Sequence, residues 1–202
     1  TVAYEYDILD AIKDGWLVPV EQQIVEIEGL DFSKVRVTAG DLNGSDLAAV
    51  MEAEKNHHGV ASATLDIIAD GQRTLVFTTS VKQAEMLSDI FNRHRAGMSD
   101  WICGKTPKHE RHEIFKKFSD GETQVLVNVG VATEGYDNPD VEVIVQARPT
   151  KSRALYAQII GRGLRPLPGV VDPFDTPEER IEAIAMSSKP CALVLDFAGN
   201  AG

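Results

Sequence analysis

Residues 158–165 carry the side chains best suited to binding a phosphate group. At about 100° per residue, a helix through this segment would place Gln158, Arg162 and Arg165 on one narrow face. Two planar guanidinium groups beside an amide, with no neighbouring acid in the sequence, form a clamp for an anion such as phosphate. Inside a helix, Gly161 and Gly163 would each lower the helix stability by about 1 kcal/mol relative to alanine. Their presence therefore indicates that another group approaches the backbone closely here. The alternative is a solvated basic face that only keeps this region soluble.

A second group of functional side chains lies in residues 131–139, directly after an apolar run. Gly135 permits a positive φ angle or a close backbone approach, and Thr133 offers a hydroxyl and an amide to a phosphate. Asp137, which precedes Asn138 in an expected turn, is suited to accepting hydrogen bonds from ribose hydroxyls. An ordinary Asx-type turn between two strands explains the same residues equally well.

The charge distribution limits the possible partners. The 202 residues include 20 basic and 31 acidic side chains, and the net charge of −11 argues against non-specific coating of nucleic acid. Residues 148–165 are the exception, with five basic side chains and no acid, so a polyanion is expected to bind there. The two cysteines, Cys103 and Cys191, are far apart, which argues against a disulfide framework or a metal site and favours a reducing cytoplasm. No apolar run approaches the ~20 residues of a membrane span, so no membrane partner is expected.

The elements that must position these residues alternate between apolar runs and helical patterns. Strands are expected at five places, namely 74–79, 101–103, 124–129, 141–147 and 191–197. Helices are expected after Ser80 and after Thr106-Pro107, each of the two hydroxyl residues acting as an N-cap, and over 152–165 and 178–186. This alternation predicts an α/β fold with a mostly parallel sheet flanked by helices. In such sheets functional groups follow the carboxyl ends of the strands.

Residues 1–70 are less regular. We expect a helix within residues 4–16 that ends at Gly15, an extended strand over 17–28 that is broken at Pro19, and a helix over 46–68. Acidic residues dominate this part, so we interpret it as an acidic arm that packs onto the sheet. The expected boundary near Asp70-Gly71 divides the chain into an arm of residues 1–70 and a domain of residues 71–202.

The order of these segments resembles the second RecA-like domain of superfamily 2 helicases. Residues 74–80 resemble helicase motif IV, residues 127–139 resemble motif V and residues 158–165 resemble motif VI, while Gly104 with Arg111 and Phe118 resembles the stretch after motif IV. Residues 133–137, 161–166 and 193–199 are most similar to the prophage and type III restriction "res"-like, RadD-like branch. The resemblance covers residues 71–199, and residues 1–70 are similar to the segment that joins the two motor domains in that branch.

The resemblance implies a mechanism and assigns roles to residues. Such motors bind ATP with Mg²⁺ between two domains, and the second domain supplies an arginine finger that stabilises the transferred phosphoryl group. Arg165 is the expected finger, with Arg162 beside it and Gln158 orienting the clamp or the attacking water. The expected ATP-binding set is Gly135, Asp137, Arg162 and Arg165, with Asp137 at the ribose. The expected contacts to the DNA backbone, single- or double-stranded, come from Thr79, Ser80, Gly104, Lys105 and Thr133.

The sequence also lacks half of this active site. It contains no GxxxxGK(S/T) phosphate-binding loop and no DExx acidic box, and Thr1 is not a natural start. We therefore expect a fragment that is inactive alone and that needs the amino-terminal RecA-like domain of the same protein, which would also hold Mg²⁺. Two alternatives stay open, namely a non-motor module that binds nucleotide or DNA, and the translocating subunit of a restriction system.

Overall fold

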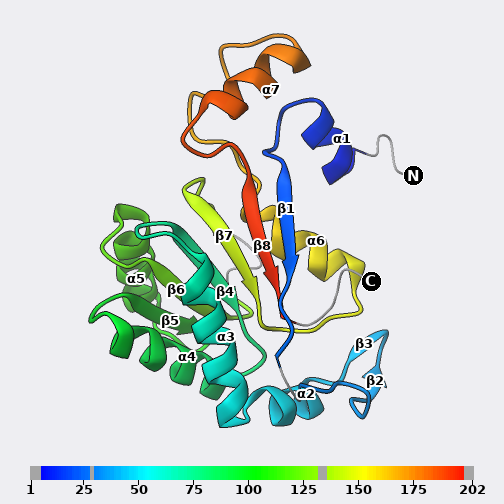
Figure 1. Cartoon of the computed structure of the whole chain (residues 1–202), viewed down its shortest axis with the longest axis vertical. Coiled ribbons are helices and arrows are strands. Elements are labelled where there is room, and N and C mark those ends of the chain that lie inside the picture. Colours follow the sequence, from blue (N-terminus) through cyan, green and yellow to red (C-terminus); the bar gives the residue numbers. More distant parts are fainter. Residues whose placement is uncertain (1–5, 28–29, 132–135, 198–202) are drawn as a thin grey trace.

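A computed structural model of the chain describes residues 6–27, 30–131 and 136–197. Six strands form one sheet in the order β1-β8-β7-β4-β6-β5, and every pairing between neighbours is parallel (Figure 1). The strands are β1 (Val20–Ile24), β4 (Arg73–Phe77), β5 (Ser99–Cys103), β6 (Val125–Val129), β7 (Val141–Gln146) and β8 (Ala192–Asp196). The predicted α/β class and the five predicted strands are therefore confirmed, with ends shifted by one or two residues.

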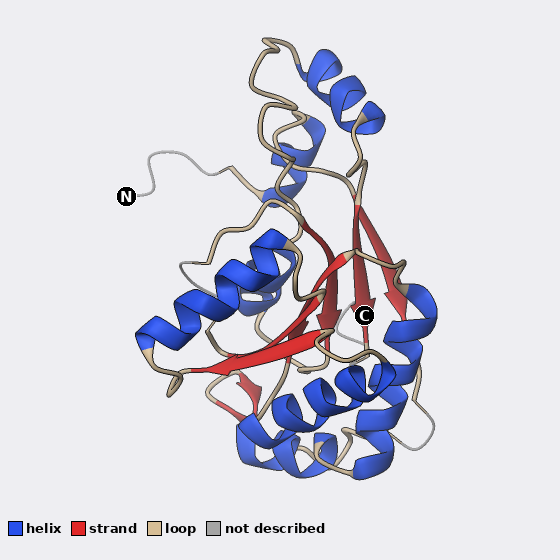
Figure 2. Cartoon of the chain, turned by 90° about the vertical axis from the view of Figure 1, so that its left-hand side faces the viewer, coloured by secondary structure: helices blue, strands red, loops and turns tan. Residues whose placement is uncertain are grey.

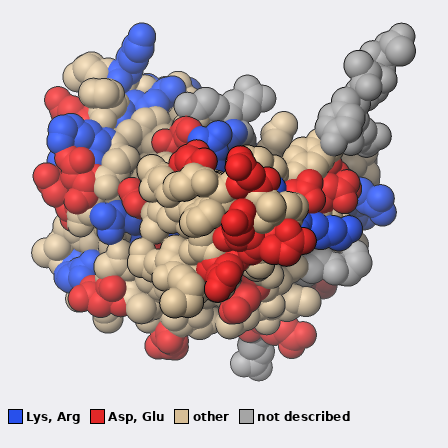
Figure 3. All heavy atoms as spheres, turned by 90° about the horizontal axis from the view of Figure 1, so that it is seen from above, with Lys and Arg blue, Asp and Glu red and all other residues tan. Residues whose placement is uncertain are grey.

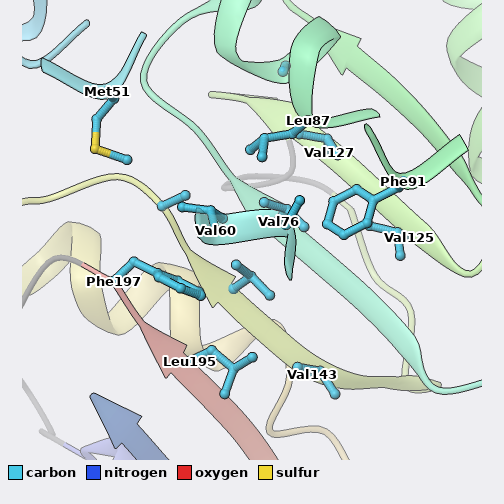
Figure 4. Close-up of a cluster of buried hydrophobic side chains, with 14 of the residues drawn as sticks. Met51, Val60, Val76, Leu87, Phe91, Val125, Val127, Val143, Leu195 and Phe197 are labelled. Carbon is cyan, nitrogen blue, oxygen red and sulfur yellow. The ribbon is translucent and has the colours of Figure 1, made fainter. Parts of the chain in front are cut away.

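Helices cover both faces of this sheet (Figure 2). One face packs against α3 (Glu54–Ile67) and α4 (Val81–His94), and the buried side chains there include Val60, Val76, Phe91 and Leu195 (Figure 4). The other face packs against α5 (Lys108–Asp120) and α6 (Arg153–Gly161) through a second buried cluster. Because helices cover both faces, the central strands β4, β6 and β7 are apolar runs without alternation.

The two helix starts predicted from N-caps have different outcomes. The Ser80 side chain accepts a hydrogen bond from the Gln83 amide at the start of α4, as predicted. At α5 the predicted cap is wrong, because Pro107 occupies the N-cap position and makes no side-chain cap bond. The Thr106 hydroxyl instead accepts a hydrogen bond from the Cys103 amide at 3.0 Å, which closes the loop after β5.

The predicted helix over 152–165 is also too long. Its start is right, since Ser152 caps α6, but α6 ends at Gly161. Beyond this point the chain turns onto the sheet, where the Leu164 carbonyl accepts a hydrogen bond from the Val18 amide at 2.8 Å and the Leu164 side chain is fully buried. Arg165 therefore does not lie on the helical face of Gln158 and Arg162, because the pairing of this segment with the sheet overrides its helical pattern.

The first seventy residues contain more elements than the sequence predicted. They form α1 (Ile8–Lys13), β1, a hairpin of β2 (Val37–Thr38) and β3 (Asp41–Leu42), α2 (Gly44–Met51) and α3. The predicted helix over 46–68 is two helices, separated at residues 52–53. β1 pairs with β8 at the edge of the main sheet, and α3 packs against α4. The boundary near residue 70 stays a prediction.

The segment between α6 and β8 forms one more helix, which packs with α1 above the sheet in Figure 1. α7 (Pro177–Met186) begins with a capping box between Thr176 and Glu179 and lies near α1 at the top of Figure 1. The Arg180 guanidinium stacks on the Trp16 ring, 4.0 Å from its centroid, and its Nε donates to the Asp14 carbonyl. These contacts join α1 to α7 over a separate apolar cluster that includes Ile184.

Gly163 is predicted to be a position where no larger residue fits. A Cβ atom there would lie 2.9 Å from Cγ1 of the buried Ile144, whereas a Cβ at Gly161 would meet nothing within 4 Å. We expect Gly163→Ala to lower the free energy of unfolding by about 1–3 kcal/mol. The control, Gly161→Ala, is expected to leave it unchanged or raise it by at most about 1 kcal/mol. Urea unfolding measures both, and equal stabilities of the two variants would contradict the prediction.

Candidate functional site

Two arginines and an aspartate from distant segments meet in the structure. The Arg165 guanidinium forms an ion pair with the Asp137 carboxylate, and Arg162 Nη1 donates to the Tyr136 carbonyl at 2.5 Å. We call Asp137, Arg162 and Arg165 the arginine cluster. The side chains of Arg165 and Asp137 are 56% and 54% exposed, so both are accessible to a ligand. Although no acid lies near Arg165 in the sequence, Asp137, 28 residues earlier in the chain, pairs with it in the fold.

Functional groups of parallel sheets usually follow the carboxyl ends of the strands. The arginine cluster instead lies at their amino ends. Arg165 and Leu164 contact residues that precede β8 and β1, and Asp137 lies four residues before the start of β7. α6 explains this placement, because it starts after the carboxyl end of β7 and runs back along the sheet. Its last residues therefore reach the amino ends of the strands.

Tyr136 anchors the turn that carries Asp137. Its ring is buried and stacks on Phe115, with 4.1 Å between the ring centroids and 16° between their planes. Its hydroxyl accepts a hydrogen bond from Asn138 Nδ2 at 3.0 Å, and burial raises the pKa of Tyr136 above its ordinary value despite this bond. Asn138 Oδ1 in turn accepts from the Asp140 amide, which is the Asx-type turn that the sequence allowed. The Asp137 backbone is thus held by its neighbours on the core side.

Lys189 was not identified from the sequence and lies beneath the arginine cluster. It is 2% exposed, and its ammonium donates to the Pro139 carbonyl at 2.6 Å and to the Arg165 carbonyl at 2.7 Å. Burial lowers its pKa to about 8, and the nearby carboxylates of Glu142 and Asp140 offset only part of this effect. A lysine between serines and a proline is typical of an exposed loop, so no local signal indicates its burial.

The remaining predicted nucleotide ligands are less well defined by the structure. Gln158 is exposed on α6, and within the described parts of the chain its side chain has no hydrogen bond. Gly135 and Thr133 lie outside the described residues. A small pocket lies between Gly161 and the arginine cluster and is lined also by Tyr136 and Asn138.

The four described candidates for nucleic-acid contact lie at the carboxyl edge of the sheet. Thr79 and Ser80 follow β4, and Gly104 and Lys105 follow β5; these two strands flank β6. Gly104 and Lys105 are exposed, and Arg111 Nη2 supports their loop by donating to the Thr106 carbonyl at 3.1 Å and to the Gly104 carbonyl at 3.3 Å.

The hydroxyl groups after β4 already have partners within the fold. The Thr79 hydroxyl donates to Gln83 Oε1 at 2.7 Å, and the Ser80 hydroxyl donates to Glu52 Oε1 at 2.6 Å. The bond from Ser80 helps to hold the pKa of Glu52 below its ordinary value, against the opposing effect of burial, and Lys82 adds an ion pair at 3.3 Å. Beside these hydroxyl groups, the side chains of Lys82 and Lys105 are exposed.

An acidic side chain from the first seventy residues holds the loop before α6. Asp41 of β3 accepts hydrogen bonds from the Thr150 hydroxyl at 2.8 Å and from the Lys151 amide at 2.6 Å. Burial raises the pKa of Asp41, but these bonds, the Leu42 amide and the charge of Arg148 outweigh burial and leave the pKa below its ordinary value. The basic segment 148–165 is therefore positioned by an acid that is remote in the sequence.

Acidic side chains gather at the end of the molecule that carries α1 and α7. Figure 3 shows this end from above, with a band of Asp and Glu side chains across it. Asp10 in the first turn of α1 and Glu178 and Glu179 in the first turn of α7 contribute to the acidic character. This end disfavours a phosphate backbone and lies away from the carboxyl edge of the sheet.

Neither a metal site nor a membrane span is found in the described part of the chain. No group of three His, Cys, Asp or Glu side chains there is arranged to hold a metal ion. No helix among the described residues is both long enough and apolar enough to cross a bilayer. The prediction that Mg²⁺ ligands lie on another domain stays a prediction.

Lys189 is expected to make the free energy of unfolding rise with pH in the alkaline range. Between about pH 8 and its ordinary value of 10.5, the unfolded chain keeps a proton that folded Lys189 has released, so folding becomes more favourable as the pH rises. Relative to Lys189→Met, the wild-type free energy of unfolding should rise by about 1.4 kcal/mol per pH unit in this window. Urea unfolding of both proteins at pH values of about 7 and about 9.5 tests this. Tyr136 is present in both and cancels, and an identical difference at the two pH values would contradict the prediction.

Comparison with known proteins identifies the family. Residues 59–166, more than half of the chain, match the family described as the helicase conserved C-terminal domain. A Saccharomyces cerevisiae protein described as the ATP-dependent helicase IRC3 is 35% identical over 166 residues, which are 81% of this chain and 24% of that protein. A 51.5 kDa protein of a Lactococcus phage is 31% identical over 80% of this chain and 36% of its own length.

Solved structures show the same fold. A fragment described as an HsdR subunit of a type I restriction enzyme from Vibrio vulnificus has a TM-score of 0.66 and 20% identity, over 95% of this chain and 34% of that one. T4 UvsW has a TM-score of 0.56 and 14% identity, over 89% of this chain and 32% of that one. The chain spans about a quarter to a third of the length of the curated relatives that it matches. It belongs to the helicase conserved C-terminal domain family, with the RecA-like fold of superfamily 2 helicases.

Proposed function

We propose that this chain is the second motor domain of an ATP-dependent DNA helicase or translocase, and that it supplies the arginine finger and contacts to the DNA backbone. The family supports a helicase motor domain, and IRC3 is described as an ATP-dependent helicase. The observation that carries the finer proposal is the convergence of Arg162, Arg165 and Asp137 from two segments into one exposed cluster.

The arginine cluster fits the triphosphate of ATP. Arg165 has a planar fork of donors, it is more than half exposed, and its described ion pair is with one equally exposed carboxylate. Such a pair contributes only about 0–1 kcal/mol, so a phosphate group with more negative charge can displace Asp137 from Arg165. Asp137 is then available to accept hydrogen bonds from ribose hydroxyls. We assign the finger to Arg165 and a supporting role to Arg162.

The finger would act on charge that develops during hydrolysis. Mg²⁺ held with ATP by the other motor domain would supply positive charge at the phosphates, and the terminal phosphoryl group would be transferred to water with ADP as the leaving group. Arg165 would donate to the oxygens of that group and stabilise their charge, an effect of about 10³–10⁵ in rate in related phosphoryl transfers. Gln158, exposed on the preceding turn of α6, would orient the clamp.

DNA would lie along the carboxyl edge of the sheet. Phosphate oxygens accept hydrogen bonds from backbone amides and lysines, and the exposed residues Gly104 and Lys105 follow β5 at this edge. Thr79 and Ser80 contribute less through their hydroxyls, because these already donate to Gln83 and Glu52. Thr133 is proposed as a further contact. Placement of the DNA here keeps it away from the acidic end of the molecule.

The finger is tested in the full-length protein with Arg165→Lys. Lysine keeps the charge but loses the planar fork, so we expect ATP to bind with similar affinity while DNA-stimulated turnover falls by about 10²–10³. Phosphate release with and without single- and double-stranded DNA measures this. The matched control is Arg93→Lys on the exposed end of α4, which should turn over like wild type. A variant at Arg165 as fast as wild type would contradict the finger, and turnover that DNA never stimulates would favour a nucleotide-binding module without motor activity.

The isolated chain should not hydrolyse ATP. It contains no phosphate-binding loop and no acidic box, so it lacks the groups that hold the triphosphate together with Mg²⁺ and position them for attack by water. We expect phosphate release by the purified 202-residue chain to equal the buffer background. Turnover that persists through successive purification steps and disappears in Arg165→Lys would overturn this expectation.

A further inference from the structure

Lys189 is buried without a carboxylate partner within ion-pair distance among the described residues. The cavity beside it is lined by Arg73 of β4, Asp140 before β7, Glu142 of β7, Leu167 and Ser188. Both carboxylates act on Lys189 only at longer range, and Arg73 is occupied by the Phe118 and Gly71 carbonyls. A buried ammonium is costly unless hydrogen bonds satisfy it, and two backbone carbonyls do so here.

These two carbonyls belong to the two segments of the arginine cluster. One is the carbonyl of Arg165 itself, and the other is that of Pro139, two residues after Asp137. The segments are otherwise joined at their exposed ends by the weak Arg165–Asp137 ion pair and by the bond from Arg162 to the Tyr136 carbonyl. Lys189 is therefore the buried tie between the backbones that carry Arg165 and Asp137.

We propose that Lys189 is a positioning residue for ATP hydrolysis, which holds the Arg165 and Asp137 backbones at a fixed separation so that the finger and the ribose ligand meet one nucleotide together. This inference rests on the proposed function. Lys189 touches neither reactant, and it acts through Arg165. A displacement of about 1 Å in a catalytic group can cost about 10²-fold in rate, so removal of this tie should have a measurable effect on turnover.

The test is a double-mutant cycle in the full-length protein. Lys189→Met removes all three N–H donors, and we expect kcat for DNA-stimulated ATP hydrolysis to fall by about 10–100-fold. In an Arg165→Lys background, Lys189→Met should lower kcat by less than about twofold, because the finger through which Lys189 acts has already been lost. An equal cost in both backgrounds, or an unchanged kcat, would overturn the proposal.

Two further variants separate positioning from a general loss of stability. Lys189→Arg keeps a charge and several donors, so it should retain more kcat than Lys189→Met. Asn92→Ala is the matched control: Asn92 also makes two hydrogen bonds to backbone groups, with Ser99 at 2.9 Å each, but it ties α4 to β5 away from the cluster. It should keep kcat within about twofold of wild type. A loss in Asn92→Ala as large as that in Lys189→Met would contradict the proposal.

The cycle also separates this inference from the proposed function. If Arg165→Lys turns over like wild type, the finger assignment fails whatever Lys189 does. If Arg165→Lys lowers kcat and Lys189→Met does not, only the positioning role of Lys189 is contradicted. Should Lys189→Met not fold, Lys189→Gln, which keeps two N–H donors without the charge, takes its place in the same cycle with the same criteria.

Discussion

The parallel order of the six strands is the constraint on which the site depends. Each connection between parallel strands must cross back over a face of the sheet, and α6 makes this return between β7 and β8. It can lie close to the sheet because Gly163 has no side chain to meet Ile144. The return brings Arg165 beside Asp137, which precedes β7. The proximity of these two residues is thus a consequence of the chain topology and of one close contact.

Sequence patterns predicted the parts of this fold that have local causes. Apolar runs such as 141–147 indicate strands because buried parallel strands need no alternation, and Ser80 indicates a helix start because its hydroxyl caps the helix directly after it. The end of α6 could not be predicted in this way. Residues 162–165 continue the spacing of polar and apolar residues of α6, but beyond Gly161 the chain turns to the sheet, where the Leu164 carbonyl accepts a hydrogen bond from the Val18 amide.

The sequence selected the residues of the candidate site but not their geometry. The motif order selected Arg162, Arg165 and Asp137, but it gave no indication that Asp137 is the partner of Arg165. The sequence does not indicate the roles of Asp41, which holds the loop before α6, or of Lys189. Their partners are backbone groups or hydroxyls that are distant in sequence. A pattern search detects side chains that are close along the chain, whereas these contacts depend on how the strands are ordered.

The contrast between Lys189 and Arg165 fits the finger role proposed for Arg165, which requires this side chain to exchange Asp137 for a phosphate group. The Arg165 side chain is exposed and pairs weakly with Asp137, so it can release this carboxylate for a phosphate at little cost. Its backbone is held from below by a buried ammonium whose bonds to carbonyls are not screened by solvent. Because the Arg165 backbone is already fixed, binding of a phosphate by its side chain does not have to order this segment as well. The burial that lets Lys189 hold the Arg165 backbone also disfavours its charged form, which lowers its pKa to about 8.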